Sequence, residues 1–131
     1  MKDLLMAKGA RTLIDVCTKV KPDETVLIVT DMYRLDIAKV IAGAAMDRGA
    51  EAIVTVIQPR ERNGQEPPAP VAEAMKKADV VFTPVTYSIT HTHAVKNAAA
   101  EGTRIIRIDG NRGLEETADT IWKELTNLPI F

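Results

Sequence analysis

Apolar and polar residues follow one another along the chain in blocks that predict helices and strands in turn. Over residues 10–20 the apolar positions recur at helical spacing, and Lys21-Pro22-Asp23 then ends the helix. Val26–Val29 is a continuous apolar run, mostly β-branched, which is typical of a strand covered on both faces. A second helical stripe covers residues 35–46, and Arg48-Gly49 closes it with a cation and a glycine.

The same alternation continues through the rest of the chain. A loop over residues 58–70 holds four of the prolines, and a second loop over 86–93 leads into an alanine-rich helix that stops at Gly102. The other predicted elements are a strand at 52–57, a short helix at 71–77, a strand at 80–82, a strand at 104–108 and a last helix at 114–125.

Strands separated by helices need crossover connections, which are right-handed and produce a parallel sheet. The sequence therefore predicts a single α/β domain over residues 1–131, an open parallel four-stranded sheet with helices on both faces in a Rossmann-like three-layer arrangement. We expect the strand order 2-1-3-4, in which the first and third strands are neighbours. Open α/β sheets bind ligands in the crevice at such a point, where the loops over 30–34 and 83–93 would meet.

Composition narrows the range of partners and compartments. The net charge is -1, from 17 Lys and Arg against 18 Asp and Glu, so we expect no broad attraction for nucleic acid or anionic membrane. No apolar run approaches the about 20 residues of a membrane span, and the N-terminus lacks the apolar region of a signal peptide. Cys17 is the one cysteine of the sequence, which suits a reducing compartment and predicts the cytoplasm.

The strongest chemical candidate is the loop Ser88-Ile-Thr-His-Thr-His93, which holds both histidines among several hydroxyls. If it opens a helix, the helix N-terminus disfavours the imidazolium form, so His91 could contact a substrate or shuttle a proton. The same helix end could instead bind a carboxylate or phosphate. A structural alternative is that a hydroxyl of this loop only caps the helix. The candidate ligand-binding residues are Ser88, Thr90, Thr92, His93 and, from the neighbouring loop, Asp31.

Several familiar sites are not predicted. His91 and His93 with Asp31 opposite do not form a convincing metal site, because i and i+2 side chains share a face on a strand but not on a helix. No glycine-rich phosphate loop follows the first strand, and no serine lies in a nucleophile elbow. A phosphoacceptor receiver is also rejected, because the third strand ends in Thr83-Pro84 rather than an aspartate.

Five segments occur in the order seen in one group of metalloenzymes. They are Lys21–Asp31, Asp47–Glu51, Glu66–Pro68, Ala78–Val81 and Ser88–Thr92. Over residues 8–108 the chain resembles the N-terminal domain of the aminopeptidase T/aminopeptidase S family of leucyl aminopeptidases, which includes the 2,5-dihydroxypyridine 5,6-dioxygenases. The resemblance implies that a further, C-terminal domain binds the divalent metal (zinc, cobalt or iron). It also implies that Ser88, Thr90, His91 and Thr92 face the active-site cavity.

The chain departs from this family in ending at Phe131 without a His/Glu/Asp cluster, and Asp109–Gly113 differs from the expected segment. Our first hypothesis is therefore a cavity-forming N-terminal domain for a small-molecule or peptide substrate, without a cofactor of its own and inactive alone. The alternative is a free-standing module that binds a small ligand or a protein. A third hypothesis is an oligomerising structural subunit, because the small residues 42–45 allow close packing and suit a homo-oligomer.

Overall fold

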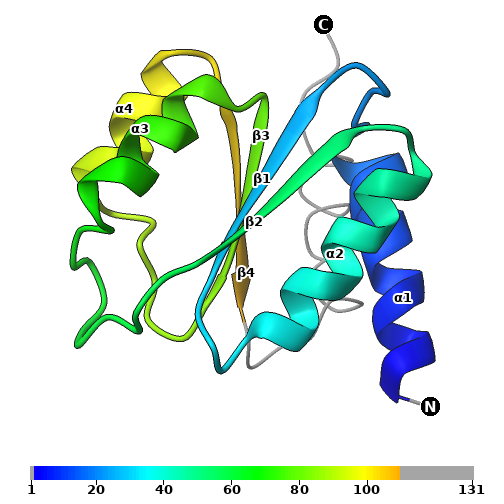
Figure 1. Ribbon diagram of the computed structural model, residues 1–131, viewed down its shortest axis with the longest axis horizontal. Coiled ribbons are helices and arrows are strands. Elements are labelled where there is room, and N and C mark those ends of the chain that lie inside the picture. The colour runs from blue at the N-terminus through cyan, green and yellow to red at the C-terminus, as the bar shows by residue number, and fades with distance from the viewer. Residues whose placement is uncertain (1, 110–131) are drawn as a thin grey trace, which may run out of the picture.

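A parallel sheet with helices on both faces forms the described part of this computed structural model, residues 2–109 (Figure 1). Its strands lie in the order β2-β1-β3-β4, and each neighbouring pair is parallel. The fold class and the strand order predicted from the sequence are thus confirmed. The elements are α1 (Lys2–Thr12), the π-helical turn η1 (Leu13–Cys17), β1 (Thr25–Thr30), α2 (Leu35–Asp47), β2 (Glu51–Val56), α3 (Ala69–Lys77), β3 (Val80–Val85), α4 (His93–Ala100) and β4 (Arg104–Asp109).

Successive residues of β1 point into two separate hydrophobic cores. Val26 and Ile28 pack with the face covered by α1 and α2, whereas Leu27 and Val29 pack with the face covered by α3 and α4 (Figure 1). Each fully buried aliphatic side chain of this size stabilises the fold by about 1.5–3 kcal/mol. The continuous apolar run in the sequence is therefore explained by a strand that is buried on both faces.

The helix ends differ from the sequence prediction in two places. The first helix begins at Lys2 rather than near residue 10. The prediction missed its first turns because the apolar residues Leu4 and Leu5 are exposed there and do not continue the buried stripe. The helix α3 begins at Ala69, since Pro70 lies in the first turn, where a missing N–H leaves no bond unmade. The predicted helix over 114–125 lies outside the described residues. No helix within residues 2–109 is long and apolar enough to span a bilayer.

An ion pair joins the amino-terminal ends of two strands that are not neighbours. The guanidinium of Arg104 donates to both carboxylate oxygens of Glu24, at 2.8 and 2.9 Å. Between them, the backbone N–H of Thr25 donates to Oδ2 of Asp79 (2.8 Å). The hydrogen bond from Arg104 lowers the pKa of Glu24 below its ordinary value of 4.5, against a smaller opposing effect of burial.

We expect Glu24→Gln to lower the free energy of unfolding near neutral pH by up to about 1 kcal/mol, because the pair is partly exposed. Since the pKa of Glu24 is lower in the folded chain, its contribution is fully present above pH 4.5 and is lost as the pH falls through the folded value. Urea unfolding of both proteins near pH 7 and near pH 3 measures this, with the exposed Glu101→Gln as control. A difference that grows on acidification would contradict the assignment.

Candidate functional site

The backbone pairing between β1 and β3 ends before Pro84. The pairing of the two strands runs from Val26–Val80 to Ile28–Phe82, whereas β3 continues beside β4 as far as Val85. Because proline has no N–H, Pro84 cannot donate a ladder hydrogen bond to β1, whereas the pairing of β3 with β4 continues past it. The hydroxyl of Thr30 donates to the carbonyl of Pro84 instead (2.8 Å). The backbone ladder thus ends at the predicted switch point of the sheet, where side-chain hydrogen bonds take over.

The carboxylate of Asp31 holds together the two loops that follow these strands. Its Oδ2 accepts the backbone N–H of Thr86 (2.8 Å), and its Oδ1 accepts the N–H of Tyr33 (2.9 Å) and the hydroxyl of Thr86 (3.2 Å). Asp31 is only 1% exposed. Because burial of an unpaired carboxylate is costly, these bonds identify Asp31 as a structural link between the loops.

The histidine loop, residues 86–92 between β3 and α4, is fixed by hydrogen bonds to itself and to the loop that follows β2. The hydroxyl of Ser88 donates to Oγ1 of Thr90 (2.9 Å) and accepts the N–H of Thr90 (3.1 Å). The N–H of Ser88 donates to Asn63, and the N–H of Gly64 donates to the Ser88 carbonyl. The side chain of Ile89, between these hydroxyls, is fully buried in the core under α3 and α4. The histidine loop is therefore a packed part of the structure.

Two side chains cap the N-terminus of α4. The hydroxyl of Thr92 accepts the N–H of Val95 (3.3 Å), as an N-cap residue does. The carboxylate of Glu66 accepts the N–H of His93 (2.8 Å) and the N–H of Ala94 (3.1 Å). A carboxylate of the chain itself thus occupies the helix end that the sequence offered to a carboxylate or phosphate ligand.

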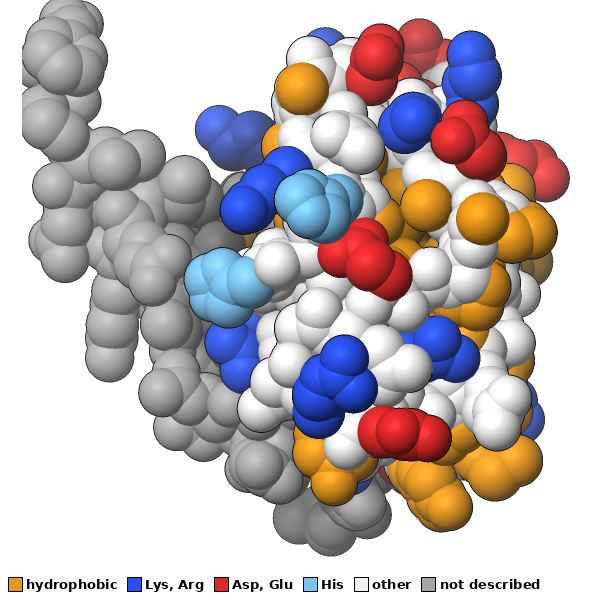
Figure 2. Space-filling model, turned by 90° about the vertical axis from the view of Figure 1, so that its left-hand side faces the viewer, with side chains coloured by type: hydrophobic (Ala, Val, Ile, Leu, Met, Phe, Trp, Pro, Cys, Tyr) orange, Lys and Arg blue, Asp and Glu red, His pale blue; other side chains and the backbone are white. Residues whose placement is uncertain are grey.

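Both imidazole side chains project into solvent. His91 precedes the Thr92 cap and His93 is the first residue of α4, and both residues are exposed. Figure 2 shows the two histidines on the same face of the molecule, beside acidic and basic side chains. Neither ring has a hydrogen-bond partner among the described residues, so each could contact a ligand or transfer a proton. Within residues 2–109, no group of three His, Cys, Asp or Glu side chains could hold a metal ion.

The predicted site residues therefore fall into three environments. His91 and His93 are exposed, Ser88 and Thr90 are half-buried and bonded to each other, and Thr92 and Asp31 are buried with partners inside the protein. Sequence reasoning associated Glu66 with the family resemblance but missed its role as a cap. The reason is that Glu66 is 27 residues from the amide of His93 in the chain.

Arg34, in the loop after β1, is a further candidate that sequence reasoning missed. The residue is half-buried, and its Nε atom is buried without a hydrogen-bond partner among the described residues. A buried donor of this kind gains from an acceptor supplied by a ligand. The sequence feature that could have identified Arg34 as a candidate is its place as a cation in the loop after the first strand.

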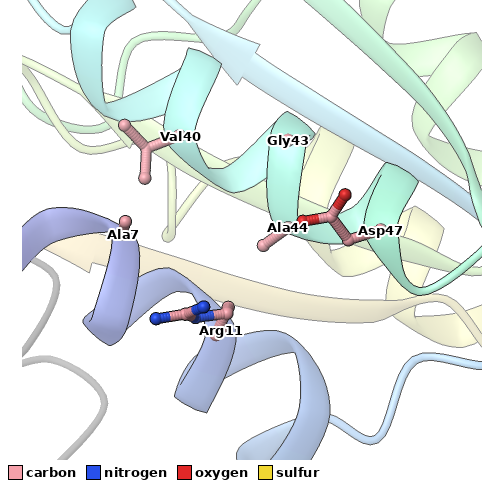
Figure 3. A pocket seen from close by; sticks show the side chains of 6 residues that line it. All are labelled: Ala7, Arg11, Val40, Gly43, Ala44 and Asp47. Carbon is pink, nitrogen blue, oxygen red and sulfur yellow. The ribbon is translucent and has the colours of Figure 1, made fainter. Parts of the chain in front are cut away.

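The groove between α1 and α2 lies away from the histidine loop. Its cavity is about 250 Å³ and is lined by residues of these two helices, shown in Figure 3: Ala7, Arg11, Val40, Gly43, Ala44 and Asp47. It belongs to the opposite face of the sheet from α3 and α4 (Figure 1). It contains none of the site residues predicted from the sequence, although Gly43 and Ala44 belong to the small residues expected to allow close packing.

Solved structures of similar fold include a dioxygenase and an aminopeptidase. A 2,5-dihydroxypyridine dioxygenase from Pseudomonas putida superposes with a TM-score of 0.68 at 12% sequence identity, covering 82% of this chain and 35% of that chain. Wild-type AmpT from Thermus thermophilus superposes with a TM-score of 0.55 at 18% identity, covering 94% of this chain and 43% of that chain. No protein-family model and no curated protein matches the sequence.

These two proteins are of the kinds that the sequence resemblance named, so the resemblance is supported at the level of the fold. Identities this low show a shared fold and nothing finer. The chain spans less than half the length of either matched chain.

We expect Asp31→Asn to lower the free energy of unfolding by about 1–3 kcal/mol, because an amide group faces backbone donors with one acceptor oxygen fewer. Amide hydrogen exchange at Tyr33 and Thr86 should also become faster. Asp23→Asn, an exposed aspartate without these partners, is the control and should change stability by less than about 0.5 kcal/mol. Equal stability of the two variants would refute the structural role of Asp31.

Glu66→Gln should lower stability by about 0.5–2 kcal/mol, because it removes the charge and one of the two acceptors at the start of α4. Hydrogen exchange at the amides of His93 and Ala94 reports the loss at the site itself. The control is Glu73→Gln, which affects only an exposed pair with Lys76 on α3. Unchanged exchange at both amides would show that Glu66 does not cap α4 in solution.

Proposed function

We propose that this chain forms one wall of the active-site cavity of a metalloenzyme related to the aminopeptidases or the dihydroxypyridine dioxygenases. The observation that carries this is the shared fold with one protein of each kind, in which the chain matches less than half of either. The finding that both are of kinds named independently by the sequence segments supports it further. A reducing compartment, the cytoplasm, fits a chain whose one cysteine, Cys17, is buried.

In this proposal the histidine loop faces the substrate. His91 contacts a small-molecule or peptide substrate or transfers a proton, since its ring is exposed on a loop whose backbone is fixed. The half-buried hydroxyls of Ser88 and Thr90 line the same surface. Asp31 and Thr92 are positioning residues, because their side chains are buried and bonded within the protein. Rigid support of this kind keeps a contact residue in a productive geometry.

The described residues do not fit the divalent metal that such enzymes would use. No set of three ligand side chains gathers within residues 2–109, and structural or catalytic zinc sites need at least three protein ligands. The metal-dependent step is therefore not assigned to this part of the chain. In the proposal, the zinc, cobalt or iron is bound by residues outside it, and the described part has no turnover of its own.

A second candidate function rests on Arg34. A free-standing module would use the crevice between the β1 and β3 ends to hold a small anion, with the buried Nε–H of Arg34 as a donor. The helix end beside His93 is a poorer place for that anion, because the carboxylate of Glu66 already accepts its N–H groups. The two candidates thus place the ligand against different residues.

The two functions can be separated with one isotope-labelled sample. We expect leucinamide or 2,5-dihydroxypyridine, at millimolar concentration, to shift the ring signals of His91 more than any other side chain. His91→Ala should abolish the response of the loop, and Lys96→Ala, an exposed position on the helix α4 that follows the loop, should preserve it. Inorganic phosphate that shifts the Nε–H signal of Arg34, but not that of exposed Arg62, would favour the anion-binding module.

Turnover assays complete the test. The chain, supplied with zinc, cobalt or ferrous iron, should neither cleave leucyl substrates nor open the 2,5-dihydroxypyridine ring. Activity of the purified chain with any of these metals would disprove the proposal that it only lines a cavity. Absence of any histidine response to either substrate would remove the assigned role of His91.

A further inference from the structure

The outer edge of β2 is an unprotected apolar edge. The strand pairs with β1 on one side, and no described residue pairs with its other side. Ile53, Val54 and Val56 are 45%, 37% and 51% exposed. Natural edge strands are usually protected by a charge, a proline, a bulge or a short length. Apart from Glu51 at its start, this strand contains neither a charged residue nor a proline.

The hydrogen-bonding groups that face outward can be assigned from the pairing with β1. The N–H of Glu51 donates to the carbonyl of Glu24 (3.0 Å), and the N–H of Ile57 donates to the carbonyl of Thr30 (2.7 Å). Backbone groups of successive residues in a strand point to alternate sides. The N–H and C=O groups of the even-numbered residues therefore point away from β1.

We propose that this edge pairs with the same edge of a second copy of the chain, antiparallel, about a two-fold axis beside Val54. In that register Val54 faces Val54 of the second copy, and Ala52 faces Val56. Each such pair exchanges two hydrogen bonds, so every outward group of the strand is satisfied. The two four-stranded sheets then form one continuous sheet.

The side chains of the strand are complementary to themselves in this register. Ala52 packs against the core under α1 and α2, so Val54 and Val56 share that face and meet their apolar counterparts. On the other face, which Ile57 shares with the second core, Ile53 lies opposite Thr55. Glu51 lies opposite Ile57, so no two like charges face each other. This self-complementarity is what an isologous, closed two-fold interface requires, and it commits the edge to a second copy.

Because Val54 lies opposite Val54 of the second copy in this register, a charge placed at this position tests the register directly. Wild-type chain at about 100 μM should have twice the mass of one chain in analytical ultracentrifugation. Val54→Lys should be monomeric, with a dissociation constant raised at least about 100-fold, because two ammonium groups face each other. Val54→Glu should be monomeric for the same reason. An equimolar mixture of the two variants should recover a dimer that contains one chain of each kind.

Recovery in the mixture also shows that both variants are folded. Leu4→Lys, on the exposed side of α1, is the matched control and should remain dimeric. Outward amides of Ala52, Val54 and Val56 should exchange slowly in the wild type and rapidly in Val54→Lys. A monomeric wild type, a dimeric Val54→Lys, or a mixture without dimer would each overturn the proposal. If these amides exchanged slowly in a monomer, a segment of the same chain would be covering the edge, and the proposal of a second copy would be wrong.

Discussion

The arrangement of the candidate site depends on the buried carboxylate of Asp31. A carboxylate withdrawn from water is tolerated only when its oxygens are hydrogen-bonded, and here Tyr33 and Thr86 supply three bonds from two loops. Pro84 prevents the sheet itself from joining these loops, because it ends the pairing between β1 and β3. The side chain of Asp31 therefore joins the two chains where the backbone ladder has ended. The histidine loop starts from this fixed point.

The sequence was sufficient for the fold because the central strands carry a strong and simple signal. Both β1 and β3 are apolar runs buried on both faces, and only strands in the middle of a sheet need that pattern. The order 2-1-3-4 is one of the orders that right-handed crossovers allow; it was expected from the sequence and is confirmed, with the histidine loop after β3, a neighbour of β1. The exposed β2 gives a weaker pattern, and its extent was still predicted within one residue.

Details of the site could not be predicted, because they depend on contacts between residues far apart in the chain. Ser88, Thr90 and Thr92 are all suitable caps by residue type, and in the structure Thr92 caps α4 while Ser88 and Thr90 bond to each other. The cap supplied by Glu66 comes from the loop that follows β2. Propensities of neighbouring residues cannot predict that this loop reaches the start of α4. Periodicity also failed at the start of α1, where the helix presents apolar side chains to solvent.

One loop runs from the end of β2 to the histidine loop and is hydrogen-bonded to it. The chain leaves β2 through Ile57, which remains bonded to β1, and then supplies Asn63, Gly64 and Glu66 to the backbone of Ser88 and His93. A second copy at the β2 edge would restrain the strand from which this supporting loop begins. Residues that contact a substrate hold it in a productive geometry when hydrogen bonds restrict their motion. Pairing at the β2 edge would therefore restrict the motion of the histidine loop without a direct contact to it. Oligomer formation and site geometry would then be coupled through one loop.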